Sequence, residues 1–354
     1  MTNLYDAHRQ WAIRPPDERF HTIESLHAAV KARQRVSREL VRSLRDIDVR
    51  ESAGGSLGIN GTTPPAMLTN WSFGQLCSLT GAPARYLRSL PPDLVTSCVR
   101  HGLGRADAEC RLLMREEPAV GSPNNLTCAA FTSSGYGRIW DADVIEFLMN
   151  AVDQTYWQIP PALPVGGSEN AGLYASDRDM FVFMVNPEDR IEVNGVKLGR
   201  GFFCWNSETG AATFGLTTFL YNYVCGNHIV WGAEDVCELR IIHRQKAPER
   251  LISEAIPLLN RFVESRPAAE AITQTITRAM ETRVGGSLEE VQERYKSAPF
   301  TKKELSDAWE TGQAEHEDVT TLWGMVQGLT ATARLLDHAN ARVDLERKAG
   351  ALLS

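Results

Sequence analysis

The chain has 354 residues, of which 43% are hydrophobic and 23% charged, so it can bury a large core in one to three domains. The formal net charge of −7 excludes a protein that wraps nucleic acid over its whole surface and leaves only a local basic patch for such contact. Because no stretch of 18 uncharged apolar residues and no signal-peptide segment occurs, we expect no membrane span. The seven scattered cysteines indicate reduced thiols and a cytoplasmic location.

The N-terminal region, residues 1–107, is predicted to be helical. Between residues 23 and 49, apolar side chains recur at helical spacing, and basic side chains fall together on a second arc. Residues 31–50 hold seven basic and three acidic side chains, a local charge of +4. This row is either an ordinary solvent-facing stripe or a set of phosphate contacts. Its members are Lys31, Arg35, Arg38, Arg42 and Arg45.

Two further short helices are predicted between residues 72 and 91, separated by Gly81, with Pro83 at the start of the second. The spacing fits a plain helical hairpin. It also fits a helix-turn-helix, in which Arg85 and Arg88 would face a DNA groove.

Residues 108–246 are predicted to form a β-rich core with one covering helix over residues 142–152. The densest apolar stretch, residues 201–232, holds two strand-like runs around a polar turn, Asn206 to Gly210. Asn194-Gly195 predicts a tight hairpin. Several apolar runs are continuous, so we expect much of the sheet to be covered on both faces.

Residues 247–354 are predicted to be helical, with a kink at Pro257. An apolar stripe over residues 319–336 indicates either internal packing or a surface for association. The fold class that follows is α+β: a mainly antiparallel central sheet between a helical N-terminal region and a helical C-terminal region.

The exit from the sheet is basic, because residues 238–246 hold three Lys or Arg against one Glu. Arg240, Arg244 and Lys246 could therefore line a groove for a nucleic-acid backbone. Nearby aromatic residues could stack bases or belong to the core; they are Trp205, Tyr221, Tyr223 and Trp231. Residues 108–245 carry 17 acidic and 9 basic side chains, so the N-terminal row is the better candidate.

Two groups of side chains have metal-ligand chemistry. The first, whose spacing does not match a zinc finger or ribbon, is Cys225, His228, Cys237 and His243. The second lies around predicted turns and could hold Mg²⁺ or Mn²⁺; it is Asp177, Asp179, Glu188 and Asp189. Turn aspartates are also common for backbone reasons, so this second group stays open. We expect no metal and no cofactor.

Nothing in the sequence nominates a nucleophile. The phosphate-loop and Rossmann glycine patterns are absent, and we expect no Gly-x-Ser-x-Gly nucleophile elbow. Glu208 could act as a general acid or base, but no partner for it can be identified from the sequence. We therefore expect a protein that is not an enzyme, with a metal-dependent activity as the remaining enzymatic alternative.

The chain resembles a phage- and plasmid-like family of proteins of unknown function found on mobile elements, over roughly residues 70–260. The stretches that carry this resemblance are Thr132-Ser-Ser-Gly-Tyr136-Gly-Arg138, Tyr174-Ala-Ser-Asp177, Asn206-Ser-Glu-Thr-Gly210, Val224-Cys-Gly-Asn227 and Ile241-Ile-His243-Arg244. Such proteins look like accessory factors of replication or recombination. A strand-rich core followed by helices is also similar to the ring-forming single-strand annealing recombinases.

Two hypotheses follow. In the first, the protein binds single-stranded DNA as a homo-oligomer through the basic residues of the N-terminal row, with Arg240, Arg244 and Lys246 assisting. In the second, it is a non-enzymatic protein-interaction factor, with an anti-defence or structural role, that uses the 319–336 stripe and binds no DNA.

Overall fold

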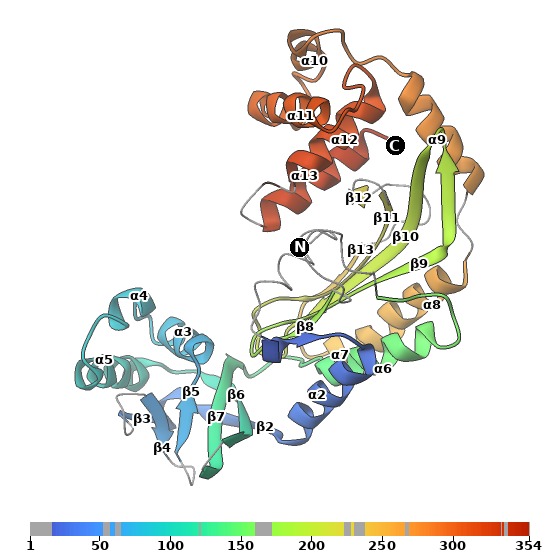
Figure 1. Cartoon of the computed structure of the whole chain (residues 1–354). Helices are drawn as coiled ribbons and strands as arrows, with labels where there is room; N and C mark the ends of the chain where they lie inside the picture. The colour runs from blue at the N-terminus through green and yellow to red at the C-terminus, as the bar shows by residue number, and fades with distance from the viewer. Residues whose placement is uncertain are drawn as a thin grey trace.

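A computed structural model describes residues 16–51, 57–60, 65–119, 122–159, 172–222, 228–229, 238–265, 269–333, 335 and 339–353. These residues form an α+β fold, as predicted, but the strands belong to two sheets and not to one central sheet. Figure 1 shows three groups of elements along a curve: a small sheet with its helices, a long sheet in the middle, and the C-terminal helices.

The N-terminal sheet has six strands in the order β2-β6-β7-β5-β4-β3, and all neighbours are antiparallel except β5 and β7. The strands are β2 (Ser37–Ser43), β3 (Asp48–Glu51), β4 (Leu57–Asn60), β5 (Ala66–Leu68), β6 (Glu109–Ala119) and β7 (Ser122–Ser133). One face packs on three helices to form a buried core. These helices are α3 (Asn70–Leu79), α4 (Ala84–Leu87) and α5 (Pro92–Arg105).

The helix predicted over residues 23–49 is wrong beyond its first half. Helix α2 (Ile23–Arg35) ends early, and the residues that follow form the edge strand β2, which pairs with β6 along its whole length. Residues that are four positions apart lie on the same side of a helix and also on the same side of a strand. Arg38 and Arg42 therefore fit both patterns. Residues 1–107 are therefore mixed and not helical, and their sheet includes β6 and β7 from beyond that boundary.

The central sheet is antiparallel throughout, in the order β1-β8-β9-β10-β11-β12, with β13 also paired to β11. Its strands are β1 (Arg19–Phe20), β8 (Leu173–Ala175), β9 (Met180–Val193), β10 (Val196–Asn206), β11 (Phe214–Asn222), β12 (His228–Ile229) and β13 (Glu238–Ile241). Asn194 and Gly195, at φ 49° and 86°, make the predicted hairpin between β9 and β10.

Both faces of the central sheet are buried over much of its length, which confirms the expectation from its continuous apolar runs. Along β9, Met180 and Val182 pack toward the helices, while Phe181 and Phe183 belong to an aromatic cluster on the other face. Trp205 is a member of that cluster and only 5% exposed, so it is a core residue and not a base-stacking surface.

Four helices cover the first face of the central sheet: α2, α6 (Asp141–Val152), α7 (Ala247–Arg250) and α8 (Ile256–Glu264). A π-helical turn, Leu251–Ala255, joins α7 to α8. It lies directly before Pro257, whose missing N–H cannot complete the regular helical bond pattern. The helical bond pattern is therefore irregular just before the proline at which a kink is predicted.

The C-terminal helices pack on the far end of β9 and β10. They are α9 (Ala269–Glu281), α10 (Leu288–Arg294), α11 (Lys302–Ala314), α12 (Leu322–Ala333) and α13 (Ala339–Ala351). Every residue of α12 from Trp323 to Ala333 is buried, and a Cβ on Gly328 would lie 2.2 Å from the Ala308 carbonyl oxygen of α11. Residues Trp323–Ala333 of the 319–336 stripe are therefore internal packing, whereas Leu335 is 70% exposed. None of the described helices combines the length and apolarity needed to cross a membrane.

Candidate functional site

The five predicted N-terminal cations do not form one row. Two of them already have carboxylate partners in the same chain: Lys31 Nζ lies 3.1 Å from Glu146 Oε2, and Arg45 Nη2 lies 3.7 Å from Asp107 Oδ1. The first pair joins α2 to α6. Lys31 lies before the start of β2, whereas Arg45 lies after its end, so the two pairs are at opposite ends of that strand. The expectation of one continuous phosphate-binding rail is therefore wrong.

The other three cations are exposed but lie on different elements. Arg35 ends α2, whereas Arg38 and Arg42 project from the edge strand β2. Among the described residues none of the three has a carboxylate partner, and Arg42 donates only to the neighbouring Val41 carbonyl at 2.9 Å. Only Arg38 and Arg42 lie on the same side of one element, so the helical spacing was wrong in placing all five cations on one surface.

The second predicted group separates in a similar way. Arg240 pairs with Glu238 (Nε–Oε1 2.5 Å), and the other oxygen of Glu238 pairs with Arg347 at 3.0 Å. Arg244 and Lys246 instead line a common surface pocket of about 500 Å³, and no described carboxylate pairs with either. Two of the eight sequence-predicted residues therefore come together.

This basic pocket contains no Asp or Glu among its lining residues, which are Gly135, Ile242, Arg244, Gln245, Lys246, Ala247 and Arg250. Arg250 adds a third cation. Its guanidinium also binds Glu254 one turn along, at 2.6 and 2.8 Å. Because that pair is about half exposed, solvent screens it, and Arg250 still contributes positive charge to the pocket.

The walls of the basic pocket come from two stretches of chain that are joined by hydrogen bonds. The Gly137 N–H donates to the His243 carbonyl oxygen at 3.3 Å, and His243 Nδ1 lies 3.2 Å from the Gly137 carbonyl oxygen. A Cβ on Gly137 would lie 1.9 Å from the Arg244 carbonyl oxygen, so only glycine fits this approach. The Tyr136 ring stacks on His243 at 5.1 Å between centroids.

Burial lowers the pKa of His243 to about 4, so the ring is neutral at pH 7. Nδ1 then carries the proton that it donates to Gly137. The wall is held by neutral hydrogen bonds and stacking, and the positive charge of the pocket comes from the arginine and lysine side chains around it.

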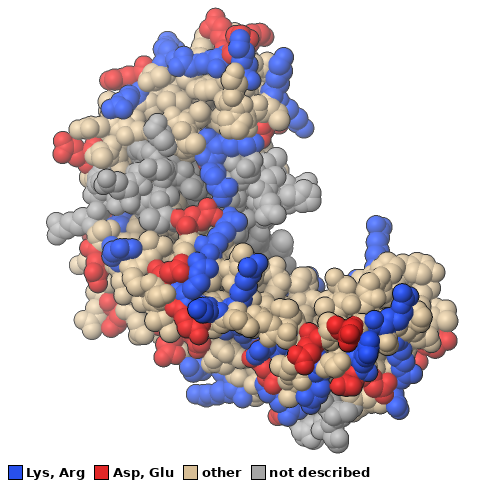
Figure 2. All heavy atoms as spheres, turned by 180° about the vertical axis from the view of Figure 1, so that it is seen from behind, with Lys and Arg blue, Asp and Glu red and all other residues tan. Residues whose placement is uncertain are grey.

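Figure 2 shows the face of the molecule opposite to that of Figure 1. Lys and Arg side chains gather along its middle, with Asp and Glu side chains between them. Positive charge is thus local on this surface, as the net charge of −7 requires. The lining of the basic pocket differs from this mixed surface, because it holds cations and no carboxylate.

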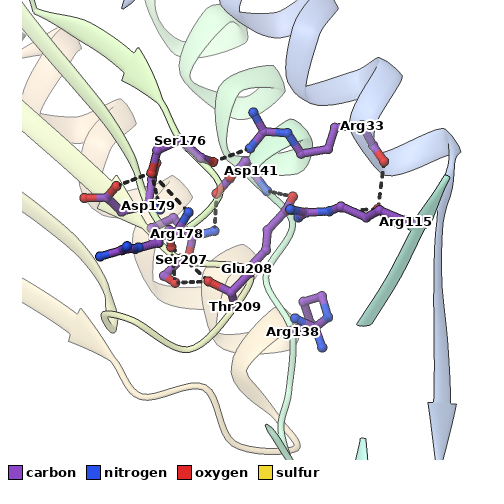
Figure 3. A network of polar contacts seen from close by, with 12 residues as sticks. Arg33, Arg115, Arg138, Asp141, Ser176, Arg178, Asp179, Ser207, Glu208 and Thr209 are labelled. Carbon is purple, nitrogen blue, oxygen red and sulfur yellow. Dashed lines mark hydrogen bonds and ion pairs between the residues drawn. The ribbon is translucent and has the colours of Figure 1, made fainter. Parts of the chain in front are cut away.

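A buried polar network joins the two sheets, and Figure 3 shows it from close by. Arg115 of β6 and Glu208, in the turn after β10, form an ion pair in which both side chains are at most 4% exposed. The second oxygen of Glu208 accepts from the Asp141 backbone N–H at 2.9 Å. Asn206 donates to Asp141 Oδ1 at 2.8 Å. We call these four residues the junction network.

Asp141 is the residue of the junction network with the most altered acidity. Burial is the main cause that raises the pKa of its carboxyl group to about 8, and the nearby charge of Glu208 raises it further. The Asp141 carboxyl group therefore keeps its proton to a higher pH than an ordinary aspartate.

The turn Asn206 to Gly210 connects the network to other parts of the fold. Trp71 Nε1 and Gln75 Nε2, both from α3, donate to the Thr209 carbonyl oxygen at 3.0 and 2.8 Å. The Tyr136 hydroxyl donates to the Ser207 carbonyl oxygen at 3.0 Å, which links the turn to the wall of the basic pocket. The turn is thus a structural hub, a role that its sequence alone did not indicate.

Residues 130–349 match the family described as Domain of unknown function (DUF932). The chain belongs to the DUF932 family. No curated protein and no solved structure matches the chain. The DUF932 match contains both walls of the basic pocket and the hub turn, but it begins inside β7 and leaves out Arg115, the cation of the junction network.

The second group of predicted metal ligands, four carboxylates that could hold Mg²⁺ or Mn²⁺, lies within the DUF932 match. Its members do not come together in the structure. Asp179 accepts from Ser176 in the β8–β9 turn, and Asp189 pairs with Arg200 at 3.0 Å. Nine residues of extended chain separate the two aspartates, roughly 30 Å along β9. No three His, Cys, Asp or Glu side chains within the described ranges are grouped for a metal ion.

The cysteine–histidine group is only partly visible in the DUF932 region. Cys225 and Cys237 lie outside the described residues, as do Tyr223, Trp231 and the side chains of Tyr221 and His228. His243 binds Gly137 as described above. The sequence analysis did not identify Gly135 and Gly137 as residues of the pocket wall. Their one signal in the sequence is their close spacing on either side of Tyr136.

Proposed function

We propose that this protein binds single-stranded DNA through the basic pocket, with Arg244, Lys246 and Arg250 on the phosphates. The observation that carries the proposal is the lining itself: three cations and no carboxylate in one pocket of about 500 Å³. Arginine and lysine are the residues that bind phosphate oxygens in proteins, as a planar fork and as a point charge.

A single strand suits this pocket better than a duplex. A duplex presents its phosphates on a convex rod, whereas an unpaired nucleotide can turn into a hollow. Ile242 lines the pocket and is 56% exposed, so it offers an apolar contact to a base without reading its sequence. The binding proposed is therefore independent of base identity.

The proposal includes assembly into a homo-oligomer. Three cations per chain provide few phosphate contacts, so one copy would hold a strand weakly at physiological salt. Several copies on one strand would add their contacts, because later binding events become intramolecular. This mode of action fits the accessory role in replication or recombination on mobile elements that the sequence resemblance implies.

The test is the salt dependence of binding to labelled oligothymidine, measured by fluorescence anisotropy. The variant Arg244→Ala/Lys246→Ala should lower the slope of log K against log salt by roughly 1.4, or 0.7 for each lost contact. The matched control is Lys302→Ala/Lys303→Ala, which removes the same charge from an exposed part of α11.

Equal slopes for the two double variants would contradict the proposal. The same measurement on Arg35→Ala/Arg38→Ala/Arg42→Ala would report whether the exposed N-terminal cations assist the pocket. Wild-type protein that binds no oligothymidine at low salt would favour the second hypothesis, a protein-interaction factor, which would then need a surface other than the buried α12.

A further inference from the structure

A second cavity, of about 400 Å³, lies between α2, β6 and the β8–β9 turn. Arg33 and Arg115 line its inner part, and the exposed side chains of Asp17, Glu116 and Asp177 line its rim. None of these residues lines the basic pocket, and the proposed DNA binding does not use this cavity.

Arg115 is the buried donor of the cavity, because the residue is only 3% exposed. Its Nη2 pairs with Glu208, and its Nε donates to Ser37 Oγ at 3.3 Å. No described residue accepts a hydrogen bond from the remaining nitrogen, Nη1. A buried guanidinium that borders a cavity with an unused donor is suited to an anionic ligand.

Arg33 provides a second guanidinium at the same place. Its Nη1 donates to the Ser176 carbonyl oxygen at 2.5 Å, which fixes the head group over the β8–β9 turn, as Figure 3 shows. Within the described residues its other two nitrogens have no acceptor. Burial lowers the pKa of Arg115, the charge of Glu208 raises it, and the charge of Arg33 lowers it again. A second anion between the two arginines would therefore stabilise both.

The rest of the lining excludes a simple anion. Four carboxyl groups and two guanidinium groups line the cavity, which gives the lining a formal charge of −2; the carboxyl groups are those of Asp17, Glu18, Glu116 and Asp177. A simple anion would be repelled by the rim, and a simple diamine would be repelled by the arginines. A ligand that carries both charges avoids both penalties.

We propose that this cavity binds a small zwitterion of the basic amino acid class. The carboxylate of the ligand accepts hydrogen bonds from Arg33 and Arg115, and its ammonium groups lie toward Asp177 and Glu116. Three apolar side chains, those of Ala32, Val36 and Ala175, also line the cavity and suit the methylene chain of such a ligand.

The test is isothermal titration calorimetry on the full chain with L-lysine, cadaverine and acetate as probes. Cadaverine is L-lysine without the carboxylate, and acetate has a carboxylate without the amines. The expected result is saturable binding of L-lysine, with at least tenfold weaker binding of the other two, because each lacks one set of charge-assisted bonds. Equal binding of L-lysine and cadaverine, binding of acetate alone, or no binding of L-lysine at millimolar concentration would overturn the proposal.

Variants separate the cavity from the rest of the protein. Arg33→Gln and Asp177→Asn should each weaken L-lysine binding about tenfold or more, while Asp153→Asn, on an exposed site at another cavity, should not. Arg115 is left unchanged, because its loss would also disturb the junction network. Unchanged L-lysine affinity in both Arg33→Gln and Asp177→Asn would overturn the assignment. The salt slope of DNA binding should be the same in Arg33→Gln as in the wild type, so the two proposals can fail separately.

Discussion

Arg115 and Glu208 form a buried ion pair between the N-terminal sheet and the turn that follows β10 of the central sheet. The two residues are 93 positions apart in the chain. Removal of both charges from water costs free energy. The attraction between the two side chains offsets this cost only while both partners are present. The contact between the sheets at this point therefore depends on two side chains together.

The first prediction concerns this pair. Glu208→Gln should lower the free energy of unfolding by about 3–5 kcal/mol, because Arg115 would remain buried without a counter-charge. Urea denaturation followed by circular dichroism gives the value. The double variant Arg115→Met/Glu208→Leu should be less destabilised than Glu208→Gln alone; a double variant that loses as much as the sum of its single variants would show that the two charges do not interact.

A second prediction follows from the acidity of Asp141. Its pKa is about 8 in the folded protein and 3.8 in the unfolded chain, so the folded state holds a proton that the unfolded state has released between these values. The free energy of unfolding should therefore fall as pH rises from about 4 to about 8, by at most about 1.4 kcal/mol per pH unit. Asp141→Asn should remove this fall, as measured by urea denaturation at a series of pH values between 6.5 and 8.

His243 should give a dependence of the opposite sign at lower pH. Its pKa is about 4 in the folded protein and 6.5 in the unfolded chain, so only the unfolded state takes up a proton between these values. Stability should fall as pH decreases from 6.5 to 4. His243→Phe keeps a ring against Tyr136 but cannot titrate, so the difference between wild type and variant should shrink toward pH 4. A difference that stays constant over this window would argue against a buried neutral imidazole.

Gly137 should be intolerant of a side chain. Gly137→Ala would place a methyl group 1.9 Å from the Arg244 carbonyl oxygen, and the wall of the basic pocket would have to move. We expect a loss of about 1–3 kcal/mol in thermal or urea unfolding and weaker binding of oligothymidine. Gly104→Ala is the matched control, because an added Cβ in α5 meets no atom within 4 Å. That variant should gain about 0.5–1 kcal/mol, as expected for alanine in a helix.

The elements that the sequence predicts well are those whose signal is local. The Asn194-Gly195 hairpin needs only its own four residues, and the two strands around the hub turn need only their apolar runs. The strand at residues 37–43 could not be recognised in this way. Its arginines fit a helix and a strand equally, and only the pairing with β6, about 70 residues later, decides between them.

The candidate site was predictable only in part for the same reason. Arg244 and Lys246 stand out as a basic exit from the sheet, and both line the basic pocket. The opposite wall, at Gly135, comes from a loop more than 100 positions earlier, so no local pattern joins it to them. Arg115 reads as an ordinary charged residue of a strand until the fold brings it to Glu208.

The region assigned to DUF932 begins at residue 130, within the last four residues of β7, and β7 pairs with β5 and β6 on its two sides. A truncated protein that starts there would keep four residues of β7, lose every other strand of the small sheet, and leave Glu208 without its partner Arg115. The smallest fragment worth expressing for biochemistry therefore starts near residue 16, upstream of β1 and α2, and not where the family assignment starts.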